Sequence, residues 1–389
     1  MKVLIVCGTR PEAIKLAPLV QELEKHPKIE CRICATGQHR EMLRQVLDFF
    51  GIQPHHDLDL MQTAQDLTAL TARLLDALRF VLAAERPDIV VVQGDTATSF
   101  AAALASFYAR IPVAHVEAGL RTLDLSAPFP EEGLRQLTAR LAAVHFAPTT
   151  ANMRALLREG IPPDRIQITG NTVIDALLWA RNKVRPLGRS ALRPYMTHEQ
   201  FISFEQARRI IMVTAHRRES FGAGLRQICT AIATLAASEP GVLFVYPVHP
   251  NPNVACAAEQ YLSHCPNVLR IRPLDYPALV SLMEASYFII TDSGGIQEEA
   301  PSLGKPVLVL REVTERQEAL DTGQVRLVGT DPASIIAAAR ELLTNEEAHR
   351  RMISSINPYG DGRAASRIAS ALTAYAHPPL RPAVLSASH

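Results

Sequence analysis

Short runs of Val, Ile and Leu alternate with longer stretches of helical periodicity along most of this chain. In the first half, apolar runs cover residues 2–7, 30–36, 89–93, 113–116, 145–147 and 166–169, and helical patterns cover residues 12–25, 40–50, 66–85, 96–109 and 132–143. The apolar runs are continuous, which is typical of parallel strands buried on both faces. Strands that alternate with helices predict βαβ units in a doubly wound sheet.

The alternation stops at residues 181–207 and then restarts. That stretch is polar, contains Pro186, Gly188 and Pro194, and shows no clear period, so we interpret it as a linker. Further strands are predicted at residues 209–214, 243–248, 268–271, 288–291, 306–310 and 325–327. We therefore expect one Rossmann-like domain over residues 1–180 and a second over residues 208–362. Residues 378–389 are expected to form a disordered tail.

The composition supports two globular domains and argues against a nucleic acid or a membrane as partner. The chain has 389 residues, of which 48% are hydrophobic and 20% charged, which is long for one core. A net charge of +1 gives no electrostatic footprint for nucleic acid, so an anion would be bound by local charges. The apolar start MKVLIVC is too short for a signal peptide, and no stretch is long enough to span a membrane. We expect a cytoplasmic protein.

The six cysteines include one CxxC, formed by Cys31 and Cys34. A metal knuckle or a redox pair would be the functional interpretation. No second CxxC is present for a zinc site, and the surrounding ECRICAT is typical of a strand. Two small core residues are therefore the favoured interpretation, and no metal is expected.

Ionisable residues and glycines follow nearly every predicted strand. Because ligands bind at the carboxyl ends of strands in open α/β sheets, these loops are the candidate site. The loop residues are Gly8-Thr9-Arg10-Pro11-Glu12, Gly94-Asp95-Thr96, Glu117-Ala118-Gly119, His216-Arg217-Arg218-Glu219, His249 and Asp292-Ser293-Gly294-Gly295. Any single loop would also suit an ordinary helix cap. Six such loops together favour a binding site.

Two of these loops resemble phosphate-binding turns. A glycine at position 8 lets the backbone approach an anion, and Arg10 and Lys15 add positive charge at a helix start. Ser293-Gly294-Gly295 offers a second turn, followed by Glu298 and Glu299, and a carboxylate there could accept ribose hydroxyls. The pattern favours a nucleoside diphosphate as the ligand. The chain contains no GxGxxG, no GxxxxGK[ST] and no HExxH, so no nicotinamide cofactor, P-loop or zincin site is expected.

At these residues the chain resembles the non-hydrolysing UDP-N-acetylglucosamine 2-epimerases of bacteria. The matching segments in the first half are GTRPEAIKLAP at 8–18, GQHREML at 37–43, QGDTATS at 93–99, HVEAGLRT at 115–122, PFPEE at 128–132 and ITGNTVIDAL at 168–177. The second half adds VTAHRRESFG at 213–222, YPVHPNP at 246–252, TDSGGIQEEAPSLGKPVLVLR at 291–311, TER at 314–316 and NPYGDG at 357–362. The resemblance covers nearly the whole chain.

The resemblance implies a glycosyltransferase-B-like pair of Rossmann-like domains with the active site in the cleft between them. A last helix at about residues 364–376 would pack back on the first domain. It also implies a homodimer, no nicotinamide cofactor, no membrane or nucleic-acid partner, and interconversion of UDP-N-acetylglucosamine and UDP-N-acetylmannosamine for a cell-surface polysaccharide.

The resemblance also assigns roles to individual residues. The catalytic group would be Asp95, Glu117, Glu131 and His216. The substrate-binding residues would be Arg10, Lys15, His216, Ser293, Gly294, Gly295, Glu299 and Arg316. Bacterial members are activated by their own substrate in a second pocket, and Gln38, Glu131 and His249 match positions that line it.

Two positions depart from the family pattern. Leu134 stands where an Asn usually precedes Arg135, and Gln317 stands where a Pro usually follows Thr-Glu-Arg. Leu134 cannot hydrogen-bond as Asn would, so it bears on the positioning of Glu131 and on the activation.

The chemistry implied is an elimination followed by re-addition. The hydrogen to be moved is not next to a carbonyl, so a carboxylate would remove it as UDP leaves the neighbouring anomeric carbon. Three other interpretations stay open at the level of sequence: a UDP-sugar glycosyltransferase of the same architecture, a hydrolysing epimerase, and a sugar-nucleotide sensor without turnover.

Overall fold

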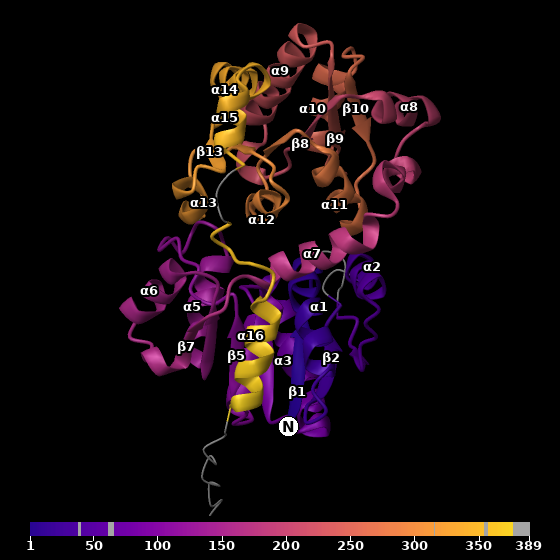
Figure 1. Ribbon diagram of the computed structural model, residues 1–389. Helices are drawn as coiled ribbons and strands as arrows, with labels where there is room; N and C mark the ends of the chain where they lie inside the picture. Colours follow the sequence, from indigo (N-terminus) through magenta and orange to yellow (C-terminus); the bar gives the residue numbers. More distant parts are fainter. Residues whose placement is uncertain (38–39, 61–65, 315, 354–356, 376–389) are drawn as a thin grey trace, which may run out of the picture. The chain divides into compact units, whose positions relative to one another are not determined.

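The computed structural model describes residues 1–37, 40–60, 66–314, 316–353 and 357–375, and these divide into two compact units. The first unit comprises Met1–Thr172 and the described residues from Arg363 onward, and the second comprises Val173–Gly362 (Figure 1). The first boundary lies earlier than the predicted residue 180. Nothing is described beyond residue 375, so the predicted tail at 378–389 lies outside the described residues.

The first unit is built on a seven-stranded parallel sheet in the order β3-β2-β1-β4-β5-β6-β7. The strands are β1 (Lys2–Cys7), β2 (Glu30–Ala35), β3 (His56–Asp57), β4 (Ile89–Gln93), β5 (Val113–Val116), β6 (Val144–Ala147) and β7 (Ile166–Ile168). The helices are α1 (Arg10–Glu24), α2 (Arg40–Phe50), α3 (Leu67–Glu85), α4 (Ala97–Tyr108), α5 (Glu131–Leu141), α6 (Thr150–Arg158), η1 (Pro163–Arg165) and α16 (Ala364–Ala374). The predicted strands and helices are present, whereas β3, α6 and η1 have no counterpart among the elements predicted from the sequence.

The second unit contains a six-stranded parallel sheet in the order β10-β9-β8-β11-β12-β13. Its strands are β8 (Arg209–Thr214), β9 (Val242–Pro247), β10 (Val268–Ile271), β11 (Phe288–Thr291), β12 (Val307–Val309) and β13 (Val325–Leu327). Its helices are α7 (Thr172–Val184, whose first residue belongs to the first unit), η2 (Gly188–Tyr195), α8 (His198–Gln206), η3 (Arg218–Ser220), α9 (Ala223–Ser238), α10 (Pro252–Leu262), α11 (Tyr276–Ala285), α12 (Gly294–Glu299), η4 (Ala300–Leu303), α13 (Gln317–Asp321), α14 (Pro332–Thr344) and α15 (Glu346–Arg351).

Residues 181–207, which the sequence predicts as a linker, are largely helical in the structure. They form the end of α7, then η2 and α8, and they belong to the second unit. Thr197 caps α8 by accepting the backbone N–H of Gln200, and Arg189 donates to the carbonyl oxygens of Phe204 and Ala207. These bonds are local or short-range and involve few apolar residues, which is why the hydrophobic pattern does not reveal them.

Helix α16 returns the chain to the first unit, where it packs against α1 (Figure 1). Ile368 and Leu372 of α16 are completely buried, and Arg367 donates to the carbonyl oxygen of Thr169 at 3.0 Å. The end of the chain therefore contributes to the core of its first unit.

Each sheet has one point at which the strand order reverses, and four of the six candidate loops, those after β1, β4, β8 and β11, lie there. In the first sheet the reversal falls between β1 and β4, and in the second between β8 and β11. At such a point the two flanking connections run to opposite faces of the sheet and leave a crevice at the carboxyl ends of the strands. The central strands are apolar and wholly buried, with Val3, Leu4, Ile5, Val90 and Val91 at 0% exposure, so the loops stand on a rigid base.

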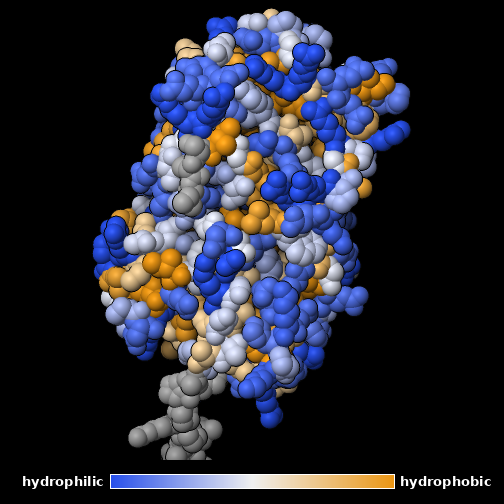
Figure 2. Space-filling model, in the orientation of Figure 1, coloured by the Kyte–Doolittle hydropathy of each residue, from blue (hydrophilic) through white to orange (hydrophobic). Residues whose placement is uncertain are grey.

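The surface of the described residues is mixed in character. Figure 2 shows hydrophobic residues in small groups among hydrophilic ones on the face in view. No helix in the described part of the chain is long and apolar enough to cross a membrane.

Candidate active site

The turn between β1 and α1 is organised by the buried carboxylate of Glu12. One carboxylate oxygen of Glu12 accepts the backbone N–H groups of Gly8 at 3.0 Å and Thr9 at 2.8 Å, and the other accepts the Thr96 hydroxyl at 2.7 Å. Burial raises the pKa of Glu12 to about 7, although these hydrogen bonds act in the opposite direction. Glu12 thus joins the first predicted phosphate turn to the loop that carries Asp95.

Gly8 is required by close packing beneath the turn. A Cβ at this position would lie 2.2 Å from the Thr98 hydroxyl oxygen and 2.4 Å from that of Thr36. These two hydroxyls are themselves hydrogen-bonded at 3.0 Å. The space that a side chain would need is therefore filled by protein on the inner side of the turn, and any larger residue would push the turn outward.

Glu117 directly follows β5 in a left-handed backbone conformation, with φ of +62°. This conformation is uncommon for a residue with a Cβ, and such strain is concentrated at functional sites. The carboxylate accepts a hydrogen bond from Lys15 and a second from the Asn171 amide at 3.1 Å, both through Oε2. Glu117 and Lys15 are about one-tenth exposed. The structure therefore brings together two predicted site residues that are far apart in sequence.

Asp95 lies at the end of β4 and forms an ion pair with Arg135 of α5. The guanidinium also contacts Glu132 at 3.2 Å, and Glu132 is wholly buried. Burial by itself would raise the pKa of Glu132, but donors from Thr122, Gln136 and Arg135 hold it below its usual range. A buried arginine between two carboxylates keeps the Asp95 side chain in one place.

Glu131 is the first residue of α5, at the positive end of the helix dipole. Its Oε2 atom is buried and finds no hydrogen-bond partner among the described residues. A buried carboxylate oxygen without a donor is costly, and such atoms are typical of positions that meet a ligand. The side chain of Leu134, on the same helix, is only partly exposed, and its backbone N–H bonds to the carbonyl of Pro130 at 3.1 Å.

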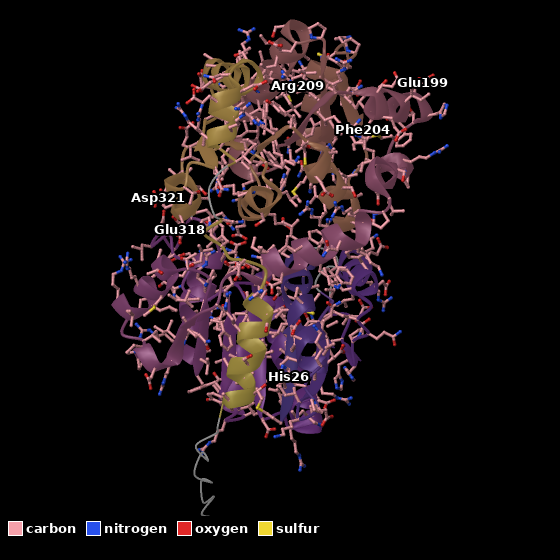
Figure 3. All side chains as sticks on the ribbon, viewed as in Figure 1. His26, Glu199, Phe204, Arg209, Glu318 and Asp321 are labelled. Atoms are coloured by element: carbon pink, nitrogen blue, oxygen red, sulfur yellow. The ribbon has the colours of Figure 1, made fainter. Side chains whose placement is uncertain are left out.

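In the second unit, Gly294 makes room for an arginine. A Cβ on Gly294 would lie 2.6 Å from the guanidinium carbon of Arg316. Arg316 also donates through Nε to Glu298 at 2.8 Å, and both residues are buried. The predicted substrate residues Ser293, Gly294 and Arg316 therefore converge on the start of α12. Helix α13, on which Figure 3 labels Glu318 and Asp321, begins directly after Arg316.

The departure at position 317 is accommodated locally. Gln317 donates from its side-chain amide to the carbonyl oxygen of Thr314 at 2.9 Å. The hydroxyl of Thr314 in turn donates to Gln297 at 2.8 Å. Side-chain hydrogen bonds thus hold the loop that presents Arg316. In the pattern of the family that the chain resembles, a proline with its fixed φ usually stands at position 317 instead.

Glu299, expected to bind ribose, lies at the end of α12. Its Oε1 accepts the hydroxyl of the buried Tyr276 at 2.8 Å, and Gly295 lies beside its Oε2, with 3.6 Å between that oxygen and an added Cβ. A carboxylate with one oxygen oriented by tyrosine is suited to accept hydroxyl protons through the other.

His216 follows β8 and lies against a buried aspartate. Its Nδ1 is 3.1 Å from Oδ1 of Asp292, which follows β11 and is completely buried. The His216 ring also stacks on that of His249, with 5.5 Å between centroids and 12° between planes. The structure therefore places a predicted catalytic residue and a predicted activating residue in direct contact within the second unit.

The remaining predicted residues are easily placed. Arg10 is the first residue of α1 and is partly exposed, whereas Gln38 lies outside the described residues. No group of three metal-binding side chains occurs in the described part of the chain, and all six cysteines are free thiols. Six residues of the site have no role predicted from the sequence: Glu12, Glu132, Arg135, Asn171, Tyr276 and Asp292. All but Tyr276 lie in or beside the segments that carry the resemblance.

A family model supports the sequence resemblance. The model of the UDP-N-acetylglucosamine 2-epimerase family matches residues 21–373. A protein of Salmonella typhimurium named UDP-N-acetylglucosamine 2-epimerase is 54% identical over 375 residues, which cover 96% of this chain and 99% of the relative. The Escherichia coli K12 protein of the same name is 53% identical, with 96% and 98% covered.

The chain is also similar in structure to solved UDP-GlcNAc 2-epimerases. The UDP-GlcNAc 2-epimerase of Neisseria meningitidis, crystallised with UDP-GlcNAc, is 46% identical and superposes with a TM-score of 0.88 over 96% of this chain and all of the other. The enzyme of Methanocaldococcus jannaschii, in complex with UDP-GlcNAc and UDP, is 31% identical with a TM-score of 0.79, over 96% and 100% of the two chains. The predicted fold class, two doubly wound Rossmann-like domains of the glycosyltransferase-B type, is confirmed.

We predict that replacing Arg135 destabilises the first unit. The substitution Arg135→Met leaves the buried Glu132 without its guanidinium and frees Asp95, so the free energy of unfolding should fall by about 3–5 kcal/mol, the usual effect of breaking a buried ion pair. Denaturant unfolding measures it. Arg140→Met, at an exposed position of the same helix, should change stability by about 0.5 kcal/mol or less. Equal effects of the two substitutions would show that the pair is not structural.

Proposed function

Because this chain belongs to the UDP-N-acetylglucosamine 2-epimerase family, we propose that it interconverts UDP-N-acetylglucosamine and UDP-N-acetylmannosamine without hydrolysis. The observation that carries the proposal is the 54% identity to a protein of that name over 96% of this chain. The site supports it, because the carboxylates and cations that the reaction needs lie in connections that follow the parallel strands of the two sheets.

The proposed reaction is an elimination followed by re-addition. A base removes the proton from carbon 2 while the bond between carbon 1 and the diphosphate oxygen breaks, which leaves a double bond between the two carbons. UDP then re-adds at carbon 1, and a proton is delivered to the opposite face of carbon 2. Every proton and electron pair is accounted for within substrate and protein, so the route uses no oxidant and no nicotinamide.

The first unit supplies the groups for proton transfer in this proposal. Asp95, Glu117 and Glu131 all stand at carboxyl ends of strands or at a helix start. Glu117 is held through one oxygen by Lys15 and Asn171, and the buried Oε2 of Glu131 has no donor among the described residues. These are oriented carboxylates in a partly buried site, which is the arrangement that general acid–base chemistry requires.

UDP is proposed to be held mainly by the second unit. Arg316 and the Ser293-Gly294-Gly295 turn would bind phosphate, Glu299 would accept ribose hydroxyls, and His216 would donate to a phosphate oxygen. Arg10 and Lys15 of the first unit would add positive charge as the diphosphate departs. The Neisseria relative was crystallised with UDP-GlcNAc and the Methanocaldococcus relative with UDP-GlcNAc and UDP, which supports a ligand of this class. We infer that the reaction takes place in the cytoplasm and that its product feeds a cell-surface polysaccharide.

Proton NMR of the purified enzyme with UDP-N-acetylglucosamine in deuterated water tests the function. We expect UDP-N-acetylmannosamine that carries deuterium at carbon 2, with UDP still attached and no cofactor added. Asp95→Asn and Glu117→Gln should each lower kcat by about 10²–10⁴-fold, the usual contribution of an acid–base group, and leave UDP binding intact in calorimetry.

Asp164 is exposed, so Asp164→Asn serves as the matched control and should retain full activity. Release of free UDP and free N-acetylmannosamine would instead show a hydrolysing epimerase. Turnover that requires an added acceptor would show a glycosyltransferase, and binding without any turnover would show a sensor.

We further propose that the chain forms a homodimer through the outer face of α3 and α4. Phe80, Phe107 and Tyr108 are each more than half exposed on these helices, next to a cavity of about 930 Å³ lined by Leu75, Leu82 and Ile111. The same cavity is bordered by Asp76, Arg79 and Arg86. A face that carries apolar side chains and both signs of charge can complement a copy of itself across a two-fold axis.

Sedimentation velocity tests the proposed dimer. The parent protein should sediment as a dimer, and Phe107→Ser combined with Tyr108→Ser should shift it to monomer at micromolar concentration. Phe129→Ser, at an equally exposed position in the loop before α5, should leave the dimer intact. A monomeric parent protein would refute the proposal, and a dimer unaffected by the double substitution would place the interface elsewhere.

Activation by substrate is the last element of the proposal. Glu131 and His249 lie in different units of the chain, and Gln38 lies outside the described residues. We propose that a second UDP-N-acetylglucosamine molecule contacts these residues and that Leu134, in place of Asn, weakens its effect. Initial rates measured against substrate concentration should be only weakly sigmoidal, and Leu134→Asn should steepen the curve. A strongly sigmoidal parent curve that the substitution leaves unchanged would contradict the role of Leu134.

A further inference from the structure

The side chain of Asp292 is hydrogen-bonded to the turn that carries His216. Its side chain is completely buried, and one carboxylate oxygen accepts the backbone N–H groups of His216 at 2.6 Å and Arg217 at 2.8 Å. The other oxygen lies 3.1 Å from Nδ1 of the His216 ring. The carboxylate therefore fixes both the backbone and the side chain of the same residue.

The arrangement is set by the sheet rather than by local sequence. Strands β8 and β11 are parallel neighbours at the switch point, with Thr214 in register with Thr291, and the hydroxyls of these two threonines are hydrogen-bonded at 2.6 Å. The backbone N–H of Asp292 bonds to the carbonyl of Thr214 at 3.1 Å. Asp292, directly after β11, is thus held beside the turn after β8 that carries His216.

The two histidines are distinguished by their partners. Nδ1 of His249 accepts the backbone N–H of Asn251 at 3.1 Å, so this nitrogen carries no proton. Burial, together with the charge that a protonated His216 would carry, lowers the pKa of His249. His216 faces a carboxylate instead, which favours a proton on its Nδ1. Of the stacked pair, His216 is the ring whose Nδ1 faces a buried carboxylate.

We propose that Asp292 is a positioning residue that holds His216 with Nδ1 protonated and Nε2 turned toward the ligand. The inference rests on the proposed function, in which His216 donates to a phosphate oxygen of UDP. With a proton kept on Nδ1 by the carboxylate, protonation of the ring places a second proton on Nε2, where it meets the negative charge that develops on the departing diphosphate. The stacked His249 ring restricts rotation of the same imidazole.

A double-substitution cycle in the full-length enzyme tests this inference. Asp292→Asn retains an acceptor for the turn but removes the charge, and it should lower kcat on the order of 10²-fold with little change in KM. His216→Asn should have a similar effect. The double variant should be no slower than His216→Asn alone, because Asp292 acts only through that ring. Multiplied losses would show a separate or purely structural role and would overturn the proposal.

A second measurement does not depend on turnover. Long-range proton–nitrogen NMR of histidine-labelled protein, with His216 assigned by its loss in His216→Asn, should show a proton on Nδ1 in the parent and a shift toward the Nε2-protonated form in Asp292→Asn. An unchanged tautomer would overturn the proposal. If the parent enzyme does not epimerise its substrate, the proposed function is refuted. The spectrum still shows in that case whether Asp292 sets the tautomer of His216. Asp331→Asn, which alters the cap of α14, is the control and should leave activity and spectrum unchanged.

Discussion

Three buried carboxylates hold the loops on which this structure depends. Glu12, Glu132 and Asp292 are at most 1% exposed, and each accepts two consecutive backbone N–H groups of a loop at the carboxyl end of a strand. The bonded pairs of N–H groups begin at Gly8, Thr122 and His216. A buried charge is tolerated only when it is hydrogen-bonded, and the loops are ordered by the same bonds. Fold stability and site geometry therefore share one set of interactions.

Each carboxylate also reaches a group with a proposed role in the chemistry. Glu12 bonds to Thr96 next to Asp95, Glu132 shares Arg135 with Asp95, and Asp292 contacts the His216 ring. The reacting groups are thus oriented before any ligand arrives, which is the condition for electrostatic stabilisation of a transition state.

The two units carry side chains suited to different parts of the proposed reaction. The first presents carboxylates that a lysine, an amide and an arginine hold in place, which suits proton transfer. The second presents the guanidinium of Arg316, the imidazole of His216 and the carboxylate of Glu299, which suits a nucleoside diphosphate. Glycine serves close packing in both, since Gly8 meets threonine hydroxyls and Gly294 meets the Arg316 guanidinium. The departures at Leu134 and Gln317 leave these contacts in place.

The sequence by itself determined the two parallel sheets and the chemistry at their edges. Hydrophobic periodicity is a local property of the sequence, so it predicts the strands directly. Polar residues that follow the strands, such as Asp95, Glu117, His216 and Ser293, then mark the edge of each sheet where a ligand binds. Only the tertiary structure decided which groups meet. Asn171 and Glu117 are 54 residues apart, Arg135 and Asp95 are 40 apart, and Asp292 and His216 are brought together by strand register. The sequence did not predict the helices of residues 181–207 or the short β3, because the hydrogen bonds that stabilise them leave no apolar period in the sequence.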